Sequence, residues 1–280
     1  MSPIAPPTDR RTLLRTGAGA CCLALAATAG CSTPAAPPGH RDPAPSGTGP
    51  APGGPSGGVR EEDPHSRAHH AAPAPHRFPP HPAQIEHGPR DRPQVALTFH
   101  GQGDPAIARA LLAEAERAGA RVTVLAVGTW LDEHPALARR ILDGGHDLGN
   151  HTQHHRTISE MPEGAAYREI TACADRLRRL TGSIGTWFRP SRTQYATPVI
   201  QRLAHRAGYP HVLSYDVDSL DFTSPGATAV TRKVAGEIRN GSVVSLHFGY
   251  ADTVAALPAL LDDLHRRRLR AVTTTELLTP

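Results

Sequence analysis

The hydrophobic residues in the second part of the chain follow two alternating patterns. From residue 94 onward, short runs rich in Val, Leu and Ile, typical of buried strands, alternate with longer segments whose apolar residues have helical spacing. This alternation predicts an α/β fold with a largely parallel sheet. The predicted strands are 94–99, 121–127, 147–150, 186–188, 211–217, 242–247 and 269–272, and the predicted helices are 105–118, 135–143, 164–180, 198–207, 227–239 and 255–268.

The first 92 residues lack both patterns. Most of the chain's 28 prolines lie at or before Pro93, and between residues 32 and 92 the only large apolar residues are Val59, Phe78 and Ile85. So few apolar side chains cannot offset the entropy lost when such a segment becomes ordered. We therefore predict a disordered linker rich in Pro, Gly, His and Ala at 32–92 and one folded domain at 93–280.

The N-terminus has the features of an export signal. An arginine pair at 10–11 precedes an apolar run of small residues at 16–30, which is too short to span a bilayer as a mature helix. We predict a twin-arginine signal peptide at 1–31. The sequence Thr-Ala-Gly-Cys at 28–31 resembles a lipobox, and the alternative is ordinary cleavage with Cys31 as an incidental thiol. Lipidation at Cys31, which we favour, would hold the protein on the outer face of the cytoplasmic membrane; otherwise it would be secreted.

Charge and cysteine content limit the classes of function. The chain has 30 Lys and Arg residues against 26 Asp and Glu residues, and no basic stripe is interleaved with aromatic residues. A nucleic-acid partner is therefore not expected, and the sequence indicates no protein partner. Cys173 is the single cysteine of the predicted domain, so no disulfide can form within it.

Titratable side chains gather at the ends of the predicted strands. His100 follows the first strand, the His-rich segment 151–155 follows the third, and Arg189 follows the fourth. The segment 216–221 lies at the end of the fifth strand, and His247 ends the sixth. Because functional residues of parallel α/β folds collect at the carboxyl ends of strands, these positions predict one functional site.

Four of these segments carry the motifs of a known family. They are Gly145-His146-Asp147-Leu148-Gly149-Asn150-His151-Thr152-Gln153-His154-His155, Phe188-Arg189-Pro190, Asp216-Val217-Asp218-Ser219-Leu220-Asp221-Phe222 and Gly241-Ser242-Val243-Val244-Ser245-Leu246-His247. Because of these four motifs, residues 94–278 resemble the polysaccharide deacetylases of carbohydrate esterase family 4, which share the chitooligosaccharide deacetylase homology domain. The resemblance implies an irregular (β/α) barrel and metal-dependent removal of acetyl groups from N-acetylated sugars.

The resemblance also implies roles for individual residues. His151 and His155 occupy metal-ligand positions, and their four-residue spacing on a helical turn would point both imidazoles the same way. Arg189 would orient the catalytic base, and His247, paired with Asp221, would protonate the departing amine. The cofactor would be one divalent metal ion, with zinc favoured over cobalt or nickel.

The first motif departs from that of the family. Where the family has Thr-Phe-Asp-Asp-Gly, which supplies the general base and a metal ligand, this chain has Thr98-Phe99-His100-Gly101. Three interpretations stay open. His100 replaces the base and Asp104 folds back as a third metal ligand; or His100 is the third ligand and Asp104 or Asp218 is the base; or the site is inactive.

The sequence thus predicts an exported metal-dependent hydrolase that removes acetyl groups from N-acetylated cell-wall or related polysaccharides. The alternative is a catalytically degraded deacetylase-like domain that binds glycans or has a structural role in the cell envelope. The candidate residues are His100, Arg189, Asp221 and His247 for catalysis, His151, His155 and Asp104 for the metal, and the aromatic residues Trp187, Tyr195 and Phe222 for the sugar.

Overall fold

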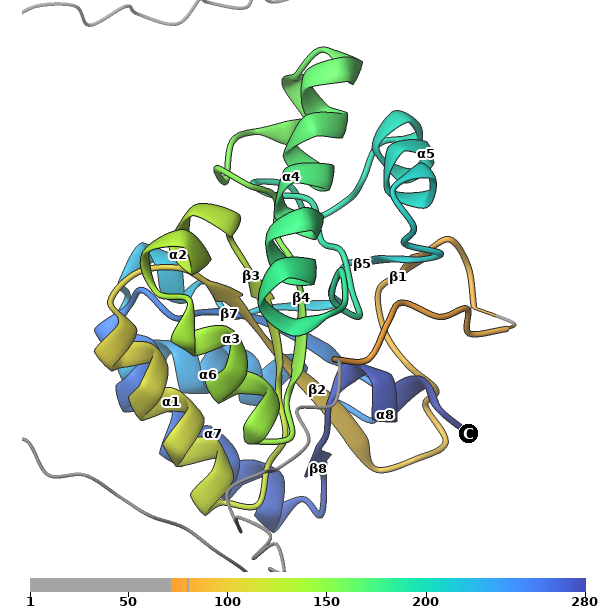
Figure 1. The fold of residues 1–280 in the computed structure, drawn as a ribbon. Coiled ribbons are helices and arrows are strands. Elements are labelled where there is room, and N and C mark those ends of the chain that lie inside the picture. Colours follow the sequence, from red (N-terminus) through yellow and green to blue (C-terminus); the bar gives the residue numbers. More distant parts are fainter. Residues whose placement is uncertain (1–71, 80) are drawn as a thin grey trace, which may run out of the picture. The chain divides into compact units, whose positions relative to one another are not determined.

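Parallel strands form the centre of the molecule (Figure 1). The computed structural model describes residues 72–79 and 81–280, all within one compact unit at 63–280. Five strands run in the spatial order β4-β3-β2-β7-β6, with every neighbouring pair parallel, and β8 pairs with the beginning of β2. Their bounds are β2 Gln94–Gly101, β3 Thr123–Ala126, β4 Asp147–Asn150, β6 Val217–Asp218, β7 Val243–His247 and β8 Arg270–Ala271.

A bent segment closes these strands into a barrel. β5 (Val212–Leu213) pairs with β1 (Gln84–Ile85), and Phe188 forms single bridges to Asn150 of β4 on one side and to β5 on the other. A few residues later the same segment continues as β6 and pairs with β7. The ring of parallel pairings confirms the predicted irregular (β/α) barrel, although the strand predicted at 186–188 is reduced to the two bridges of Phe188.

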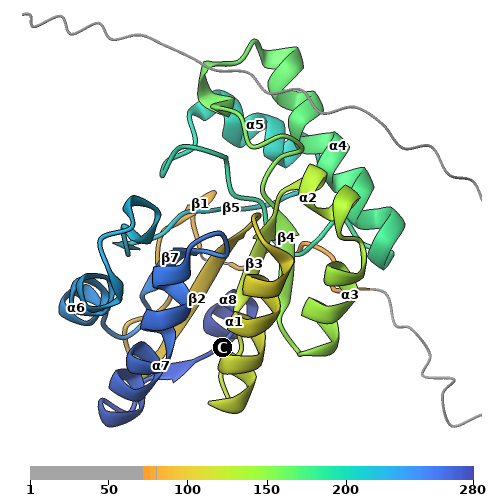
Figure 2. The same cartoon turned by 90° about the vertical axis from the view of Figure 1, so that its left-hand side faces the viewer.

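Helices cover the outside of the barrel (Figures 1 and 2). Two of them begin where the sequence indicates, because the side chains of Asp104 and Thr197 accept hydrogen bonds from the first turn and a proline follows each cap. The six predicted helices are confirmed with small shifts at their ends, and α2 and α8 are additional. The bounds are α1 Pro105–Arg117, α2 Gly128–Glu133, α3 Ala136–Asp143, α4 Glu163–Thr181, α5 Pro198–Arg206, α6 Ala227–Glu237, α7 Ala251–Arg266 and α8 Thr274–Leu278.

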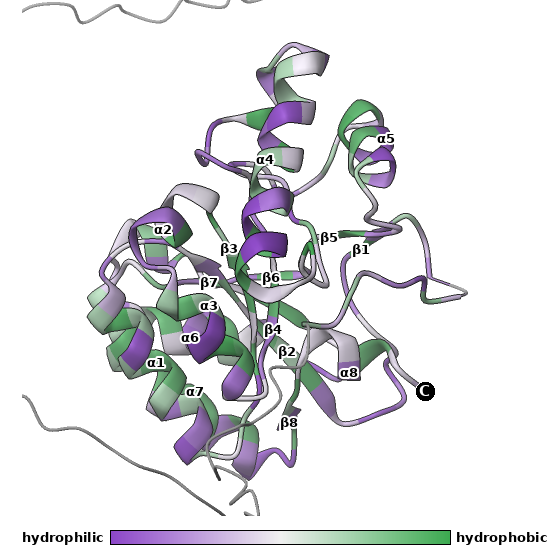
Figure 3. Ribbon diagram, viewed as in Figure 1, coloured by the Kyte–Doolittle hydropathy of each residue, from purple (hydrophilic) through white to green (hydrophobic). Residues whose placement is uncertain are grey.

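Hydrophobic clusters hold the helices on the strands. The largest cluster joins β2, β3 and β7 to α1, α3, α6 and α7, and a second one packs α4 and α5 against Phe188. Figure 3 shows the hydrophobic colour on much of β2, whereas α1 and α4 carry both colours, as amphipathic helices do. The strand ends that carry the functional residues therefore rest on a packed framework.

The folded part of the chain begins earlier than the predicted boundary at residue 93. Phe78 and Ile85 are only 6% and 1% exposed and belong to one cluster with barrel residues. Arg90 forms an ion pair with Asp216 at 2.8 Å. The prediction of disorder is therefore wrong for 72–79 and 81–92, because the two large apolar residues of this stretch both fit the same cluster.

Some predictions concern residues outside the described part of the chain. The signal peptide at 1–31, the lipidation site Cys31 and the linker up to residue 71 are among them. Within the described residues, no helix combines the length and the apolar character needed to cross a membrane. All other residues predicted for the functional site lie in the described part.

Candidate metal and catalytic site

A pocket of about 580 Å³ opens at the carboxyl ends of the strands. His100 in β2 lies opposite His247 in β7, and Asp218 in β6 lies opposite Ser245 in β7. Side chains that are far apart in the sequence therefore lie close together in the structure, as the pattern at the strand ends predicts. The pocket is lined by His100, Gln102, His155, Arg192, Thr193, Gln194, Tyr215, Asp218, Phe222, Ser245, His247 and Tyr250.

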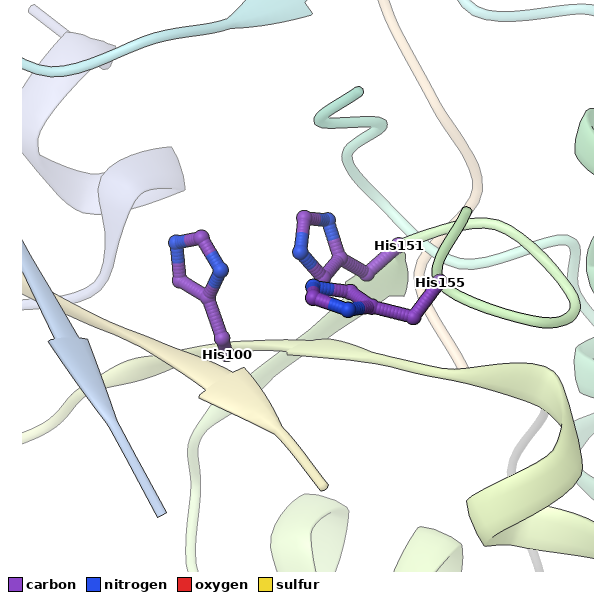
Figure 4. A group of neighbouring side chains, drawn as sticks. All are labelled: His100, His151 and His155. Atoms are coloured by element: carbon purple, nitrogen blue, oxygen red, sulfur yellow. The ribbon is translucent and has the colours of Figure 1, made fainter. Parts of the chain in front are cut away.

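Three imidazoles converge at this pocket (Figure 4). His100 comes from β2, His151 directly follows β4, and His155 lies four residues later; one potential ligand atom of each lies within 4.8 Å of the other two. Nδ1 of His100 and Nε2 of His151 are buried and have no hydrogen-bond partner among the described residues. Because a buried polar atom without a partner is unfavourable, nitrogens that converge in this way fit a metal ion as their common partner.

Hydrogen bonds on the far side of two rings determine which nitrogen faces the cluster. Nδ1 of His151 donates to the backbone carbonyl oxygen of Arg189 at 3.0 Å, so Nε2 of His151 keeps a free lone pair. Nε2 of His100 lies 3.1 Å from the hydroxyl oxygen of Ser245. When Nε2 of His100 carries the proton and donates a hydrogen bond to this hydroxyl, Nδ1 of His100 presents its lone pair to the other two rings.

The loop after β4 brings His155 back beside His151 by a route that differs from the predicted helical turn. Thr152 and His155 have left-handed backbone conformations, with φ of 70° and 53°, which a regular helix excludes. Ser191 holds this loop, because its hydroxyl accepts from the Thr152 hydroxyl at 3.0 Å and donates to the carbonyl oxygen of Arg156 at 2.5 Å. The rings of His151 and His155 lie with centroids 4.9 Å apart.

Burial keeps the three imidazoles neutral. It is the largest cause that lowers the pKa of His100 and His151 well below the ordinary value, and neighbouring histidines and the charge of Arg189 add to it. Burial, followed by the charge of Arg192, lowers the pKa of His155 to about 4. Neutral imidazole is the form that binds metals, so all three rings are available as ligands at neutral pH.

Arg189 is completely buried and lies beside His100. Its guanidinium donates to the hydroxyl of Thr98 at 2.9 Å and to the carbonyl oxygens of Leu213 and Ser214 at 3.2 and 2.9 Å. None of these partners within the described chain is a carboxylate, and burial lowers the pKa of Arg189 to about 10. Nη1 of Arg189 also lies 3.4 Å from Nε2 of His100, so a positive charge on His100 is disfavoured.

Asp221 and His247 form the predicted pair. The carboxylate accepts hydrogen bonds from Nδ1 of His247 at 2.6 Å, from the backbone N–H of His247 at 2.8 Å and from the hydroxyl of Thr253 at 2.6 Å. Burial alone would raise the pKa of Asp221, but these hydrogen bonds together outweigh it and lower the pKa. An anion fixed in this way stabilises a protonated imidazole and leaves Nε2 of His247 for a substrate.

Several proteins with related sequences are named as deacetylases. The polysaccharide deacetylase family model matches residues 87–212. A peptidoglycan-N-acetylglucosamine deacetylase of Bacillus cereus is 29% identical over 194 residues, which are 68% of this chain and 90% of the relative. A chitooligosaccharide deacetylase of Rhizobium leguminosarum is also 29% identical, with 65% of this chain and 88% of the relative covered. Residues 87–212 are thus similar to the polysaccharide deacetylase family.

One solved structure with a similar fold is described as a pseudoenzyme. The solved structure of a family 4 pseudoenzyme from Bacillus anthracis has a TM-score of 0.67 and 21% identity, covering 71% of this chain and 70% of that one, which shows a shared fold. Two further relatives are longer proteins, of which this chain spans 61% and 38%. Similarity to the polysaccharide deacetylase family therefore leaves the activity to be argued from the site itself.

Asp104 does not join the histidines. Its side chain is exposed and accepts a hydrogen bond from the backbone N–H of Ala106 at 2.8 Å, which caps the N-terminus of α1. The prediction of Asp104 as a metal ligand is therefore wrong. The physical reason is local, since Pro105 begins α1 directly after Asp104 and the Asp104 carboxylate serves as the N-cap of that helix.

The three aromatic residues predicted to contact sugar have different positions. Trp187 is 1% exposed, and its indole N–H donates to Asp147 and Thr275 inside the barrel, so its predicted role in substrate binding is wrong. Phe222 is 44% exposed and lines the pocket, with its ring 5.5 Å from that of His247. Tyr195 is 48% exposed but is absent from the pocket lining, next to residues that belong to it.

Sequence reasoning missed Ser245, Tyr215 and Arg192 as parts of the site. Ser245 carries a detectable signal, because residues two apart on a strand point to the same side and Ser245 precedes His247 by two. Tyr215 and Arg192 lie in irregular segments that join the barrel strands, where no periodicity indicates the direction of a side chain.

The buried Asp221 predicts a pH-dependent contribution to stability. Because its pKa is lower in the folded chain, its contribution is full above its unfolded pKa of about 3.9 and is lost as the pH falls through the folded value. We expect Asp221→Asn to lower the free energy of unfolding by about 2 kcal/mol at pH 7, and the difference from wild type to shrink below about pH 4. Chemical denaturation of both proteins between about pH 7 and pH 3 measures the difference in the free energy of unfolding. The exposed Asp262→Asn serves as control, and a difference that stays constant at acid pH would contradict the prediction.

Proposed function

We propose that the domain is an exported, metal-dependent hydrolase that removes acetyl groups from N-acetylated polysaccharides. The convergence of the unpartnered nitrogens of His100 and His151 with the ring of His155 carries this proposal. Three neutral imidazoles with one position left open are a recognised arrangement for catalytic zinc. The donor set fits zinc best, and cobalt and nickel accept the same ligands.

The chemistry requires a group that activates water and a group that protonates the leaving amine. A divalent ion held by His100, His151 and His155 would supply Lewis-acid polarisation of the acetyl carbonyl and acidify water when bound. With His100 among the ligands, the general base must come from another residue. Asp218 is the only carboxylate among the described residues that line the pocket, and it is therefore the base in our proposal.

The proton transfers then follow from the chain's own residues. Asp218 takes a proton from the attacking water, whose oxygen adds to the carbonyl carbon of the acetamide. His247, in its protonated form and oriented by its hydrogen bond to Asp221, donates its Nε2 proton to the amine nitrogen as the carbon–nitrogen bond breaks. The products are acetate and a free amino sugar, and Phe222 and Tyr250 offer the rings on which the sugar lies.

A second candidate is glycan binding without catalysis. It is favoured by the loss of both first-motif carboxylates, which leaves His100 and Gly101 in their place. The relative from Bacillus anthracis, described as a pseudoenzyme, lends weight to this alternative. Acetate release and metal binding separate the two candidates.

The metal proposal predicts a specific loss in a His100→Ala variant. The full chain is loaded with zinc and its metal content is measured, while acetate release from N-acetylated glycans is assayed alongside. We expect about one zinc per chain, and a loss of more than about tenfold in zinc affinity when His100 is replaced.

The exposed His265→Ala on α7 is the matched control and should bind zinc like wild type. Unchanged affinity in His100→Ala would remove His100 from the ligand set. A wild-type chain that binds no zinc and releases no acetate from any glycan would overturn the hydrolase proposal in favour of glycan binding.

The assignment of the base predicts opposite behaviour for two aspartates. Asp218→Asn should lower turnover by about 100-fold or more with the zinc content unchanged, because the attacking water loses its proton acceptor. Asp104→Asn should retain turnover, and asparagine also preserves the helix cap. Steady-state kinetics with metal analysis check both, and near-normal turnover of Asp218→Asn would require another base.

Export and anchoring form the remaining part of the proposal, supported by the arginine pair at 10–11 and the lipobox-like segment at 28–31. We expect Cys31→Ser to abolish incorporation of a labelled fatty acid and to release the protein from the membrane fraction. Cys22→Ser is the control. Retention of the label in Cys31→Ser would rule out Cys31 as the lipidation site.

A further inference from the structure

The loop at 191–195, which forms one wall of the pocket, is fixed by its own polar side chains. Ser191 donates to the carbonyl oxygen of Arg156, and the hydroxyl of Thr193 donates to the carbonyl oxygen of Tyr195 at 2.9 Å. The amide of Gln194 donates to the carbonyl oxygen of Tyr215 at 3.0 Å. Three polar side chains of this short loop thus serve to hold its backbone in place.

Arg192 differs from these neighbours. Its side chain is exposed, lines the pocket, and forms no hydrogen bond or ion pair with any residue of the described chain. Its backbone has φ of 56°, in the left-handed region that residues other than glycine rarely adopt and that clusters at functional sites. The loop therefore presents an unpartnered guanidinium to the pocket from a fixed backbone.

The charges around the pocket indicate what this guanidinium recognises. Arg192 is the only arginine or lysine among the described lining residues, and Asp218 is the only acid. The two form no ion pair with each other, so the charge of Arg192 is free for a ligand. A planar guanidinium binds carboxylates through two parallel hydrogen bonds, and such bonds to charged groups are stronger than neutral ones.

We propose that Arg192 binds a carboxylate carried by the glycan, so that the substrate is an acidic N-acetylated polysaccharide rather than a neutral one. This inference rests on the proposed function and narrows its substrate class. The carboxylate has two possible sources in such polymers, a lactyl ether on an N-acetylated sugar or a neighbouring uronic acid. Both present the same chemistry to Arg192.

Matched oligosaccharides test the proposal in the full chain. They are an N-acetylglucosamine tetramer, an oligomer with free lactyl carboxylates, the same oligomer with these carboxylates converted to amides, and an oligomer that alternates uronic acid with N-acetylglucosamine. Wild type should prefer one carboxylate-bearing oligomer over the neutral ones, and the preferred oligomer identifies the source. Equal kcat/KM for all four would overturn the inference.

Two variants assign the preference to Arg192. Arg192→Gln should lower kcat/KM for the preferred acidic oligomer about tenfold and change that for the neutral tetramer less than about twofold. Arg192→Lys keeps the positive charge but loses the planar guanidinium. Its kcat/KM for the acidic oligomer should lie between those of wild type and Arg192→Gln. Arg156→Gln is the matched control, because Arg156 is exposed nearby without lining the pocket. An equal loss of kcat/KM for the acidic oligomer in Arg156→Gln, or no loss of it in Arg192→Gln, would contradict the assignment.

Binding of the same oligosaccharides by calorimetry separates this inference from the proposed function. If no oligomer releases acetate but the acidic one binds more tightly and Arg192→Gln removes the difference, the hydrolase proposal fails and the carboxylate site stands. If acetate is released from all oligomers alike and binding shows no preference, the carboxylate site fails and the hydrolase stands.

Discussion

The buried guanidinium of Arg189 joins the elements on which the site depends. It links Thr98 of β2 to the segment that begins with β5, and the backbone carbonyl of the same residue sets the ring orientation of His151. A buried charge is unfavourable unless its surroundings satisfy it, and here hydroxyl and carbonyl oxygens do so together with the ring of Tyr215 at 5.3 Å. The strand ends therefore cannot shift far relative to one another without leaving this charge unsatisfied.

The altered first motif changes the electrostatics around Arg189. An aspartate at position 100 would face this guanidinium as a counter-ion, whereas His100 is neutral and leaves the arginine charge uncompensated. The same proximity makes imidazolium at this position unfavourable, so His100 is better suited to bind a metal than to take up a proton. The substitution thus separates two roles that adjacent carboxylates fill in the family, and the base must come from another strand.

The sequence predicted the parts of the structure that depend on local patterns and motifs. Strand and helix periodicity located most elements, and the motifs located the histidines and the Asp221 and His247 pair. The failures depend on long-range geometry. Trp187 and Phe188 are neighbours that face opposite sides of the barrel wall, and no local pattern shows that Trp187 is the inward one. In the sequence, Phe78 and Ile85 are isolated apolar residues, and only the folded structure shows the hydrophobic cluster to which both belong.

The site as a whole is more positive than one with two carboxylates would be. Arg189 and Arg192 contribute positive charges, whereas His100, His151 and His155 contribute none at neutral pH, and a divalent ion would add to the positive charge. Such a field acts differently on two kinds of anion. A carboxylate on the substrate is present before and during the reaction, so its attraction raises affinity without raising turnover. The oxyanion of the acetyl group exists only near the transition state, so the same field acting on it lowers the barrier.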